Sequence, residues 1–244
     1  MISAGIAGER AACGRLPRAT VSPPAATRPG SRGILGGTFD PIHHGHLAIA
    51  EEVREALGLE RVVFVPSNVP PHRPDAPRAS ANHRLAMVRL AVAENPAFEV
   101  SDLEVRRPGP SYTVDTLRTL AGDRVSTDPP GALDANDLVF VLSSEAFEGF
   151  GTWRDPEGVL RLATLAIVPR DGHDDPDPAA IERRFGPLAS RVTLLPGPLL
   201  AISGSAIRAR AAARRSLRYL VPDAVARYIG DHDLYTTPGR TSAP

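Results

Sequence analysis

Short apolar runs alternate with longer amphipathic stretches from residue 33 to residue 235, and this order limits the fold more than any other feature of the sequence. The apolar runs have the length of buried strands, and the stretches between them have the length and periodicity of helices. Strands that are separated by helices pair in parallel, because each helix carries the chain back across the sheet. We therefore expect an α/β fold, a Rossmann-like doubly wound parallel sheet with helices on both faces.

The predicted elements can be placed by residue number. We expect strands at residues 33–35, 62–65, 98–100, 138–142, 164–168 and 192–195, and helices at residues 46–57, 82–94, 113–121, 156–162, 178–185, 205–214 and 222–230. Residues 66–79 and 122–136 are rich in Pro, Gly and Asp and predict loops. Ligands of a doubly wound sheet bind at the carboxyl ends of its strands, so the first strand-to-helix turn is the first candidate site.

The chain of 244 residues is long enough for one well-buried domain, which we expect at residues 33–235. Residues 1–32 are rich in Ala, Arg, Pro, Gly and Ser and lack the apolar segment of a secretory signal, so we expect a disordered tail. An upstream start codon or a transit peptide remains an alternative explanation of these residues. Residues 236–244 predict a flexible C-terminal tail.

The composition excludes several function classes. The chain has no lysine, so all 28 basic residues are arginine, and a Walker-type phosphate loop and Schiff-base chemistry are both excluded. The single cysteine, Cys13, excludes internal disulfides and thiolate zinc clusters. Acidic and basic residues balance at 28 each, which predicts no affinity for nucleic acid or membrane surfaces. We expect a cytoplasmic protein, and the sequence leaves a homo-oligomer open.

The first turn has the composition of an anion site. Residues 36–46 read GGTFDPIHHGH and lead into a predicted helix. The paired glycines Gly36 and Gly37 let the backbone approach a phosphate chain, and a helix start supplies free N–H groups and partial positive charge. His43 and His46 add donors that are neutral or cationic near pH 7. A capping or surface role is the ordinary alternative for a histidine, and a zinc site would need a third ligand.

A second turn with the same chemistry lies near the carboxyl end. Residues 202–208 read ISGSAIR and precede a basic helical stretch. The hydroxyls of Ser203 and Ser205 suit a helix cap, which is the simplest interpretation. The N–H groups of a capped helix start also bind anions, and Arg208 lies one turn into the helix, within reach of the same phosphates.

These segments resemble one known family. Residues 36–46 resemble GxFDPxHxGH, the hallmark of the nicotinate/nicotinamide-nucleotide adenylyltransferase group within the HxGH nucleotidyltransferase superfamily, and residues 202–208 resemble its ISSTxIR element. Residues 70–73 (PPHR) are similar to its PPHK element, and residues 111–117 (SYTVDTL) reproduce its SYTxDTL. Thr152 and Trp153 match its Thr-Trp pair. The resemblance covers roughly residues 33 to 235.

The resemblance implies transfer of the adenylyl group of ATP to nicotinate mononucleotide, with Mg²⁺ entering on ATP and no metal site of the protein's own. It implies catalytic roles for His43, His46 and Arg208. ATP would be bound by these three residues together with Gly36, Gly37, Thr38, Phe39, Ser203 and Ser205. The acceptor would be bound by Asp40, Arg73, Tyr112, Thr113, Thr152 and Trp153, with Trp153 stacked on the pyridine ring and Asp40 mainly organising the first turn.

The sequence departs from the family pattern at two places. Gly204 replaces the usual serine of ISSTxIR, and residues 140–145 read FVLSSE where the family has FIxGxD, so that Ser143 replaces a glycine and Glu145 an aspartate. Gly204 removes one hydroxyl contact but leaves the backbone donors, whereas the change at residues 143–145 puts ribose recognition and acceptor choice in question. Two alternatives therefore remain: another HxGH adenylyltransferase, with nicotinamide mononucleotide or phosphopantetheine as acceptor, and a nucleotide-binding regulator without turnover.

Overall fold

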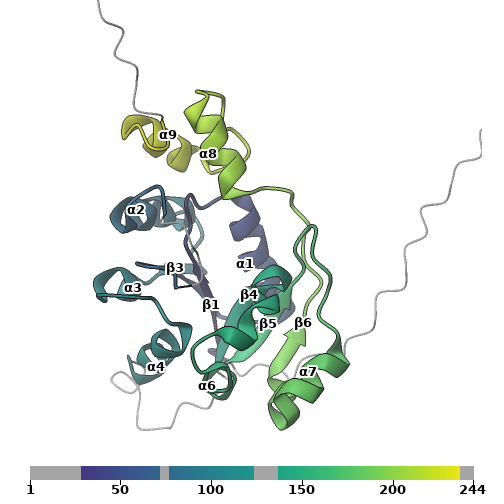
Figure 1. Ribbon diagram of the computed structural model, residues 1–244. Coiled ribbons are helices and arrows are strands. Elements are labelled where there is room, and N and C mark those ends of the chain that lie inside the picture. Colours follow the sequence, from purple (N-terminus) through teal and green to yellow (C-terminus); the bar gives the residue numbers. More distant parts are fainter. Residues whose placement is uncertain (1–28, 72–76, 124–136, 237–244) are drawn as a thin grey trace, which may run out of the picture.

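A six-stranded parallel sheet forms the centre of the computed structural model, which describes residues 29–71, 77–123 and 137–236 (Figure 1). The strand order is β3-β2-β1-β4-β5-β6, and every pair is parallel. The strands are β1 (Arg32–Gly37), β2 (Arg61–Pro66), β3 (Phe98–Val100), β4 (Leu138–Ser143), β5 (Thr164–Val168) and β6 (Val192–Leu194). All six were predicted, and the α/β fold is confirmed.

The seven predicted helices are also present. They are α1 (His44–Ala56), α2 (Ala81–Val92), α4 (Thr113–Asp123), α6 (Pro156–Leu162), α7 (Pro178–Phe185), α8 (Gly204–Ala212) and α9 (Asp223–Asp231). The structure adds four short segments that the sequence pattern does not show: α3 (Leu103–Arg106), α5 (Ser144–Glu148) and the 3-10 turns η2 (Phe150–Thr152) and η3 (Gly186–Arg191). Such segments are too short to display a helical periodicity.

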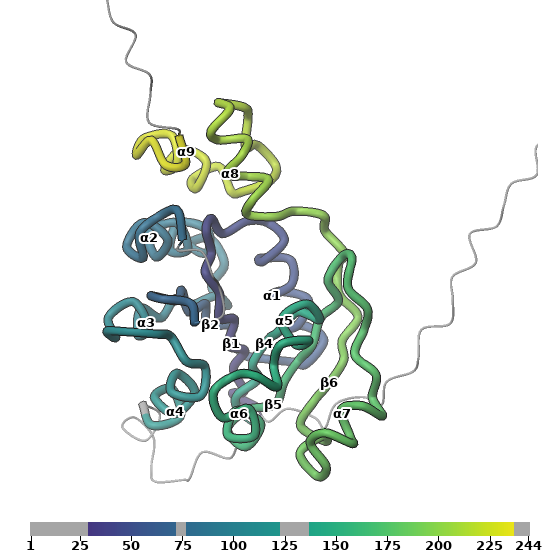
Figure 2. Tube along the Cα trace, viewed as in Figure 1, coloured from purple at the N-terminus to yellow at the C-terminus, as the bar shows by residue number. Residues whose placement is uncertain are grey.

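Strand side chains alternate between two apolar layers. Val62 and Phe64 of β2 pack in the layer that contains buried residues of α1, α2, α8 and α9. Val63 and Val65 of the same strand point to the other layer, which contains residues of α4, α6 and α7. Helices therefore cover both faces, and Figures 1 and 2 show α8 and α9 placed beside α2 and the start of α1. None of the helices in the described residues is long and apolar enough to cross a membrane.

The strand order reverses direction at β1. From β1 the chain moves through α1 to β2 and β3, and it then returns to the opposite side of β1 as β4. A crevice opens at such a reversal, outside the carboxyl ends of the two central strands. Here those ends are Gly37 and Ser143, so the first turn of the predicted anion site lies at the crevice.

The predicted boundaries need three corrections. The expected tail extends too far, because Ser31 is buried, its carbonyl accepts a hydrogen bond from the Glu60 N–H (2.9 Å), and β1 already begins at Arg32. Pro66 closes β2 instead of opening a loop, and Gly122 belongs to α4. Residues 1–28, 124–136 and 237–244 lie outside the described residues, so most of the second predicted loop and the C-terminal tail remain predictions.

Candidate active site

The first turn brings two histidines into contact at the start of α1. His43 has extended backbone angles and caps the helix, and its N–H donates to Nδ1 of His46 (3.2 Å). The two imidazole rings stack with centroids 3.7 Å apart. Phe39, in the left-handed region with φ 49°, is buried and meets the His46 ring edge-on at 5.1 Å. Two residues predicted from one motif thus form a single compact unit.

His43 is neutral at pH 7. Its side chain is buried, and Nδ1 has no hydrogen-bond partner among the described residues. Burial, assisted by the positive charge of Arg170, lowers the pKa of His43 from 6.5 to about 4. Gly45 leaves room for the ring, because a Cβ there would lie 3.0 Å from Nδ1 of His43. The site therefore holds a buried polar nitrogen without the cost of a buried charge.

Asp40 ties the first turn to the rest of the domain. Its carboxylate accepts hydrogen bonds from the N–H groups of Arg78 (2.8 Å) and Ala79 (3.1 Å) and from the hydroxyl of Tyr235 (2.7 Å). Burial and the neighbouring charge of Asp40 raise the pKa of Tyr235 far above its usual value, so this hydroxyl stays a donor. These bonds link the turn to α2 and to the C-terminal segment, and they occupy both carboxylate oxygens of Asp40.

A buried arginine that the motif analysis missed supports the same turn. The side chain of Arg84 in α2 is 1% exposed. It donates to three carbonyls, those of Thr38 (2.7 Å), Asn68 (3.0 Å) and Ala79 (3.2 Å). Burial lowers the pKa of its guanidinium, and the charge of Asp40 acts in the opposite direction. Arg84 therefore connects the end of β1, the loop after β2 and the start of α2.

The second phosphate motif lies directly against the first. Arg208 of α8 donates through Nη1 to the carbonyl of Asp40 (2.7 Å). Ser203 caps α8 by accepting from the Ala206 N–H (3.2 Å), and its hydroxyl is 3.1 Å from that of Ser205. Two helix starts that are far apart in the sequence thus meet at the crevice.

Gly204 permits this close approach. A Cβ at this position would lie 3.0 Å from the Asp40 carbonyl oxygen and 3.3 Å from Nη1 of Arg208. Both contacts are tighter than most real Cβ contacts, so a side chain here would require a small displacement of α8 or of the turn. The departure from the family serine therefore accompanies a tight junction between the two motifs.

The acceptor-side residues gather around α4 and η2. Trp153 is half-buried and meets Phe150 (5.4 Å) and Phe140 (6.3 Å) edge-on, so it is neither a core residue nor a surface residue. Tyr112 immediately precedes α4, and the guanidinium of Arg154 lies 4.7 Å from the centre of its ring. Both aromatic side chains pack against the same apolar layer.

Thr113 begins α4, and the exposed Thr152 donates to the carbonyl of Gly149 (2.8 Å). Gly36 and Gly37 lie at the end of β1. A Cβ on Gly36 would lie 3.4 Å from the ring of Phe140, and a Cβ on Gly37 would lie 3.0 Å from the ring of Phe39. Arg73 lies outside the described residues.

The chain after β2 and the SYT segment before α4 are bonded to each other, and we call the joined segments the wall. The N–H of Asn68 donates to the hydroxyl of Ser111 (3.0 Å), and the N–H of Ser111 donates to the carbonyl of Val69 (2.9 Å). The chain after β2 is thereby joined to the SYT segment before α4. Since Arg84 also holds the carbonyl of Asn68, this wall and the first turn share one support.

The second departure from the family pattern shapes the neighbouring loop. Ser143 caps α5 by accepting from the Ala146 N–H (3.2 Å), and the buried hydroxyl of Ser144 accepts from the N–H of Arg170 (3.0 Å). The carboxylate of Glu145 lies 3.4 Å from Nε of Arg170. This segment therefore fixes the loop after β5. Within the described residues, no group of three His, Cys, Asp or Glu side chains could hold a metal ion.

Comparison with known proteins agrees with this geometry. Residues 34–210 match the cytidylyltransferase-like family. A protein of Symbiobacterium thermophilum described as a probable nicotinate-nucleotide adenylyltransferase is 46% identical over 203 residues, which cover 83% of this chain and 93% of the relative. A Geobacter metallireducens protein with the same description is 44% identical over 219 residues, which cover 84% and 97% of the two chains.

Solved structures show the same fold at lower identity. The structure of Plasmodium falciparum nicotinic acid mononucleotide adenylyltransferase complexed with NaAD superimposes with a TM-score of 0.66 at 19% identity, and the match covers 84% of this chain and 97% of that one. The extent of these matches places the whole described domain within one family. The chain therefore belongs to the cytidylyltransferase-like family, alongside relatives described as nicotinate-nucleotide adenylyltransferases.

Proposed function

We propose that the chain transfers the adenylyl group of ATP to nicotinate mononucleotide, giving nicotinate adenine dinucleotide and pyrophosphate in NAD biosynthesis. The observation that carries the proposal is the junction of the two phosphate motifs, in which Arg208 bonds the turn that positions His43 and His46. The names of the relatives with 44–46% identity support the choice of reaction and acceptor.

The site suits a reaction that needs positioning and charge stabilisation. The acceptor's 5′-phosphate attacks the α-phosphorus of ATP, an oxygen–phosphorus bond forms, and the bond to pyrophosphate breaks. A phosphate monoester has a second pKa near ~6, so it is already nucleophilic at pH 7 and requires no general base. N–H groups at the starts of α1 and α8, together with His46 and Arg208, would meet the charge on the phosphates. His43, being neutral, would act as a hydrogen-bond partner.

We infer that Mg²⁺ enters with ATP. Mg²⁺ commonly keeps several waters and binds through substrate phosphates, so it needs few protein ligands. It would neutralise charge on the polyphosphate. The donors of the first turn and of Arg208 would bind the phosphate oxygens that remain, because arginine and backbone N–H groups bind anions and not cations.

The acceptor side favours a ligand with an aromatic ring and a carboxylate. Trp153 is half-buried, which leaves part of its ring able to stack on a pyridine. The start of α4 carries partial positive charge, and the guanidinium of Arg154 lies over Tyr112 beside it. Nicotinate carries a carboxylate that nicotinamide lacks. We therefore assign the acceptor as nicotinate mononucleotide, with Tyr112, Thr113 and Trp153 as its contacts.

The predicted roles of Asp40, Thr152 and Arg73 in acceptor binding have different support. The Asp40 carboxylate is occupied by three protein donors, so we assign it a positioning role in place of direct acceptor binding. Thr152 lies beside Trp153 and remains a predicted acceptor contact. Arg73 also remains a prediction from the resemblance alone.

The assignment is tested by pyrophosphate release from ATP with three acceptors: nicotinate mononucleotide, nicotinamide mononucleotide and phosphopantetheine. We expect the fastest release with nicotinate mononucleotide.

His46→Ala and His43→Ala should each lower turnover by at least ~10²-fold, the usual scale for loss of one transition-state donor. His232→Ala, an exposed histidine at the end of α9, serves as control. Faster release with another acceptor would overturn the acceptor assignment, and no release with any would indicate a regulator.

The depressed pKa of His43 predicts a pH-dependent stability. The unfolded chain binds a proton at this residue below about pH 6.5 and the folded chain only below about pH 4, so stability falls as the pH drops through this window. Between pH 7 and pH 5, urea denaturation should show that the wild type loses roughly 2 kcal/mol more than His43→Asn. Equal losses in both proteins would show that His43 has an ordinary pKa in the folded state.

Trp153 separates acceptor binding from core packing. Trp153→Ala should raise the KM for nicotinate mononucleotide roughly 5- to 150-fold, the scale of a lost stacking contact, and leave the KM for ATP nearly unchanged. If Trp153 only fills the core, its truncation should instead lower the free energy of unfolding of the protein by about 3–5 kcal/mol. Thermal melts measured beside the kinetics distinguish the two. A large stability loss with unchanged acceptor KM in the folded fraction would contradict the stacking role.

A further inference from the structure

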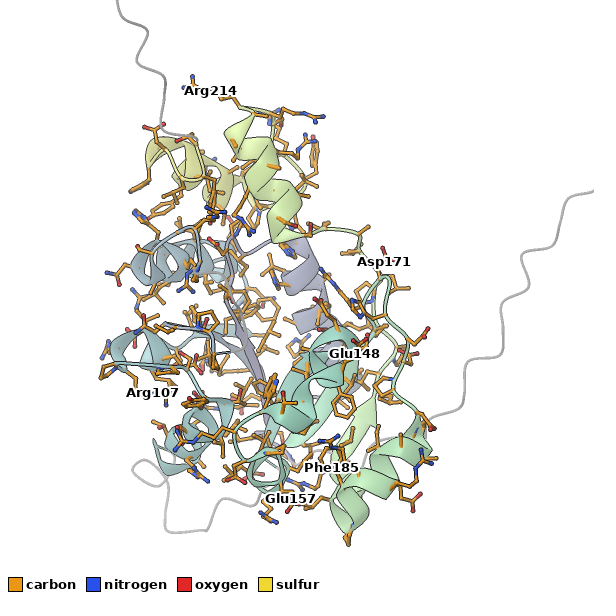
Figure 3. The ribbon with its side chains drawn as sticks, in the orientation of Figure 1. Arg107, Glu148, Glu157, Asp171, Phe185 and Arg214 are labelled. Carbon is orange, nitrogen blue, oxygen red and sulfur yellow. The ribbon has the colours of Figure 1, made fainter. Side chains whose placement is uncertain are left out.

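Arg170 lies just beyond the carboxyl end of β5, in a loop that α5 holds in place. Its N–H donates to the hydroxyl of Ser144 (3.0 Å), and Nε lies 3.4 Å from the carboxylate of Glu145. Further along the loop, Nδ1 of His173 is 2.8 Å from the carboxylate of Glu148. Figure 3 shows the labelled Asp171 and Glu148 on this side of the molecule. The backbone of Arg170 is therefore fixed, while its side chain has a single ion-pair partner among the described residues.

The Arg170 side chain borders the second phosphate motif. A hollow of about 200 Å³ is lined by Arg170, Asp171, Leu200, Ala201, Ile202 and Ser203. Ser203 is the cap of α8, and a Cβ on Gly45 of the first turn would lie 3.8 Å from Ile202. The positive charge of Arg170 also contributes to the low pKa of His43. The hollow thus lies beside the starts of α8 and α1, to which we assign phosphate binding.

Two of the predicted phosphate contacts are uncharged or already have a partner in the protein. His43 is neutral at pH 7, and Arg208 is engaged with the carbonyl of Asp40. Arg170 is 32% exposed, and its partner Glu145 is 52% exposed. An ion pair this open to solvent is weak. A multiply charged anion in the hollow can therefore compete with Glu145 for the guanidinium of Arg170. Arginine binds phosphate oxygens through charge-assisted hydrogen bonds.

We propose that Arg170 is a phosphate-contacting residue whose guanidinium turns from Glu145 to the terminal phosphates of the nucleotide, which leave as pyrophosphate. Glu145, the glutamate that departs from the family pattern, then competes with the ligand for Arg170. The identity of the anion as ATP or pyrophosphate rests on the proposed function. The contact itself rests on the hollow, the ion pair and the position of Ser203.

Calorimetric titration of the full chain with inorganic pyrophosphate, with and without Mg²⁺, tests the contact without turnover. Arg170→Gln should weaken binding at least about tenfold, since one charge-assisted hydrogen bond is lost, and Arg170→Lys should recover part of it. Glu145→Gln should tighten binding, because the competing carboxylate is gone. Pyrophosphate has no ribose, so a separate role of Glu145 in ribose recognition does not enter. The control is Arg161→Gln, an exposed arginine of α6 that is paired with Glu157 (2.5 Å).

The results decide between clear outcomes. Unchanged affinity in Arg170→Gln, or no pyrophosphate binding by the wild type at millimolar concentration, would overturn the proposal. If Arg170→Gln does not fold, the affinity of Glu145→Gln for pyrophosphate decides. Tighter binding by Glu145→Gln supports the proposal, and unchanged or weaker binding overturns it. In the transfer reaction, Arg170→Gln should raise the KM for ATP and leave the acceptor KM unchanged. The two proposals can fail separately. If Arg170→Gln loses pyrophosphate binding but the wild type transfers the adenylyl group to no acceptor, the Arg170 contact stands and the proposed function is overturned.

Discussion

The hydrogen bonds of Arg84 and Asp40 fix the turn on which the rest of the site depends. Arg84 satisfies three carbonyls from separate segments, and Asp40 satisfies two N–H groups and one hydroxyl. Buried backbone groups without partners cost about 1–3 kcal/mol each, so these bonds determine which loop conformation is stable. The turn can hold two stacked histidines at a helix start because Arg84 and Asp40 fix its backbone. Preorganised donors of this kind account for much of the rate enhancement in such reactions.

The two sides of the crevice are built on different physical principles. The side to which we assign the phosphates offers backbone N–H groups, the guanidinium of Arg208 and a His43 ring kept neutral by burial. The side to which we assign the acceptor offers aromatic surface, since Trp153 and Tyr112 pack against the apolar layer that contains α4, α6 and α7. Asn68 joins the two, because its carbonyl binds Arg84 and its N–H binds Ser111. A displacement of this one segment would therefore affect both substrates.

The fold and the positions of the two turns at helix starts could be predicted because their signals are local. Strand and helix periods show directly in the sequence, and the glycines and capping residues that precede a helix mark where it begins. Arg84 could not be assigned in this way, since an arginine in an amphipathic helix normally faces solvent. Its spacing of four residues from the buried Val88 was the available signal. The partners of Arg170 and the tight contact at Gly204 arise only when distant segments meet, and no local pattern reports them.

Kinetics of Arg84→Lys test the central claim, that a buried arginine preorganises both halves of the site. Lysine keeps the charge but cannot donate in a fork to three carbonyls. We expect kcat/KM for ATP and for the acceptor both to fall at least ~10²-fold in protein that is still folded, because misplaced groups lose the effect of orientation. Arg89→Lys on the same helix, where the side chain is 57% exposed, should retain wild-type kinetics. Wild-type kinetics in folded Arg84→Lys would contradict the account.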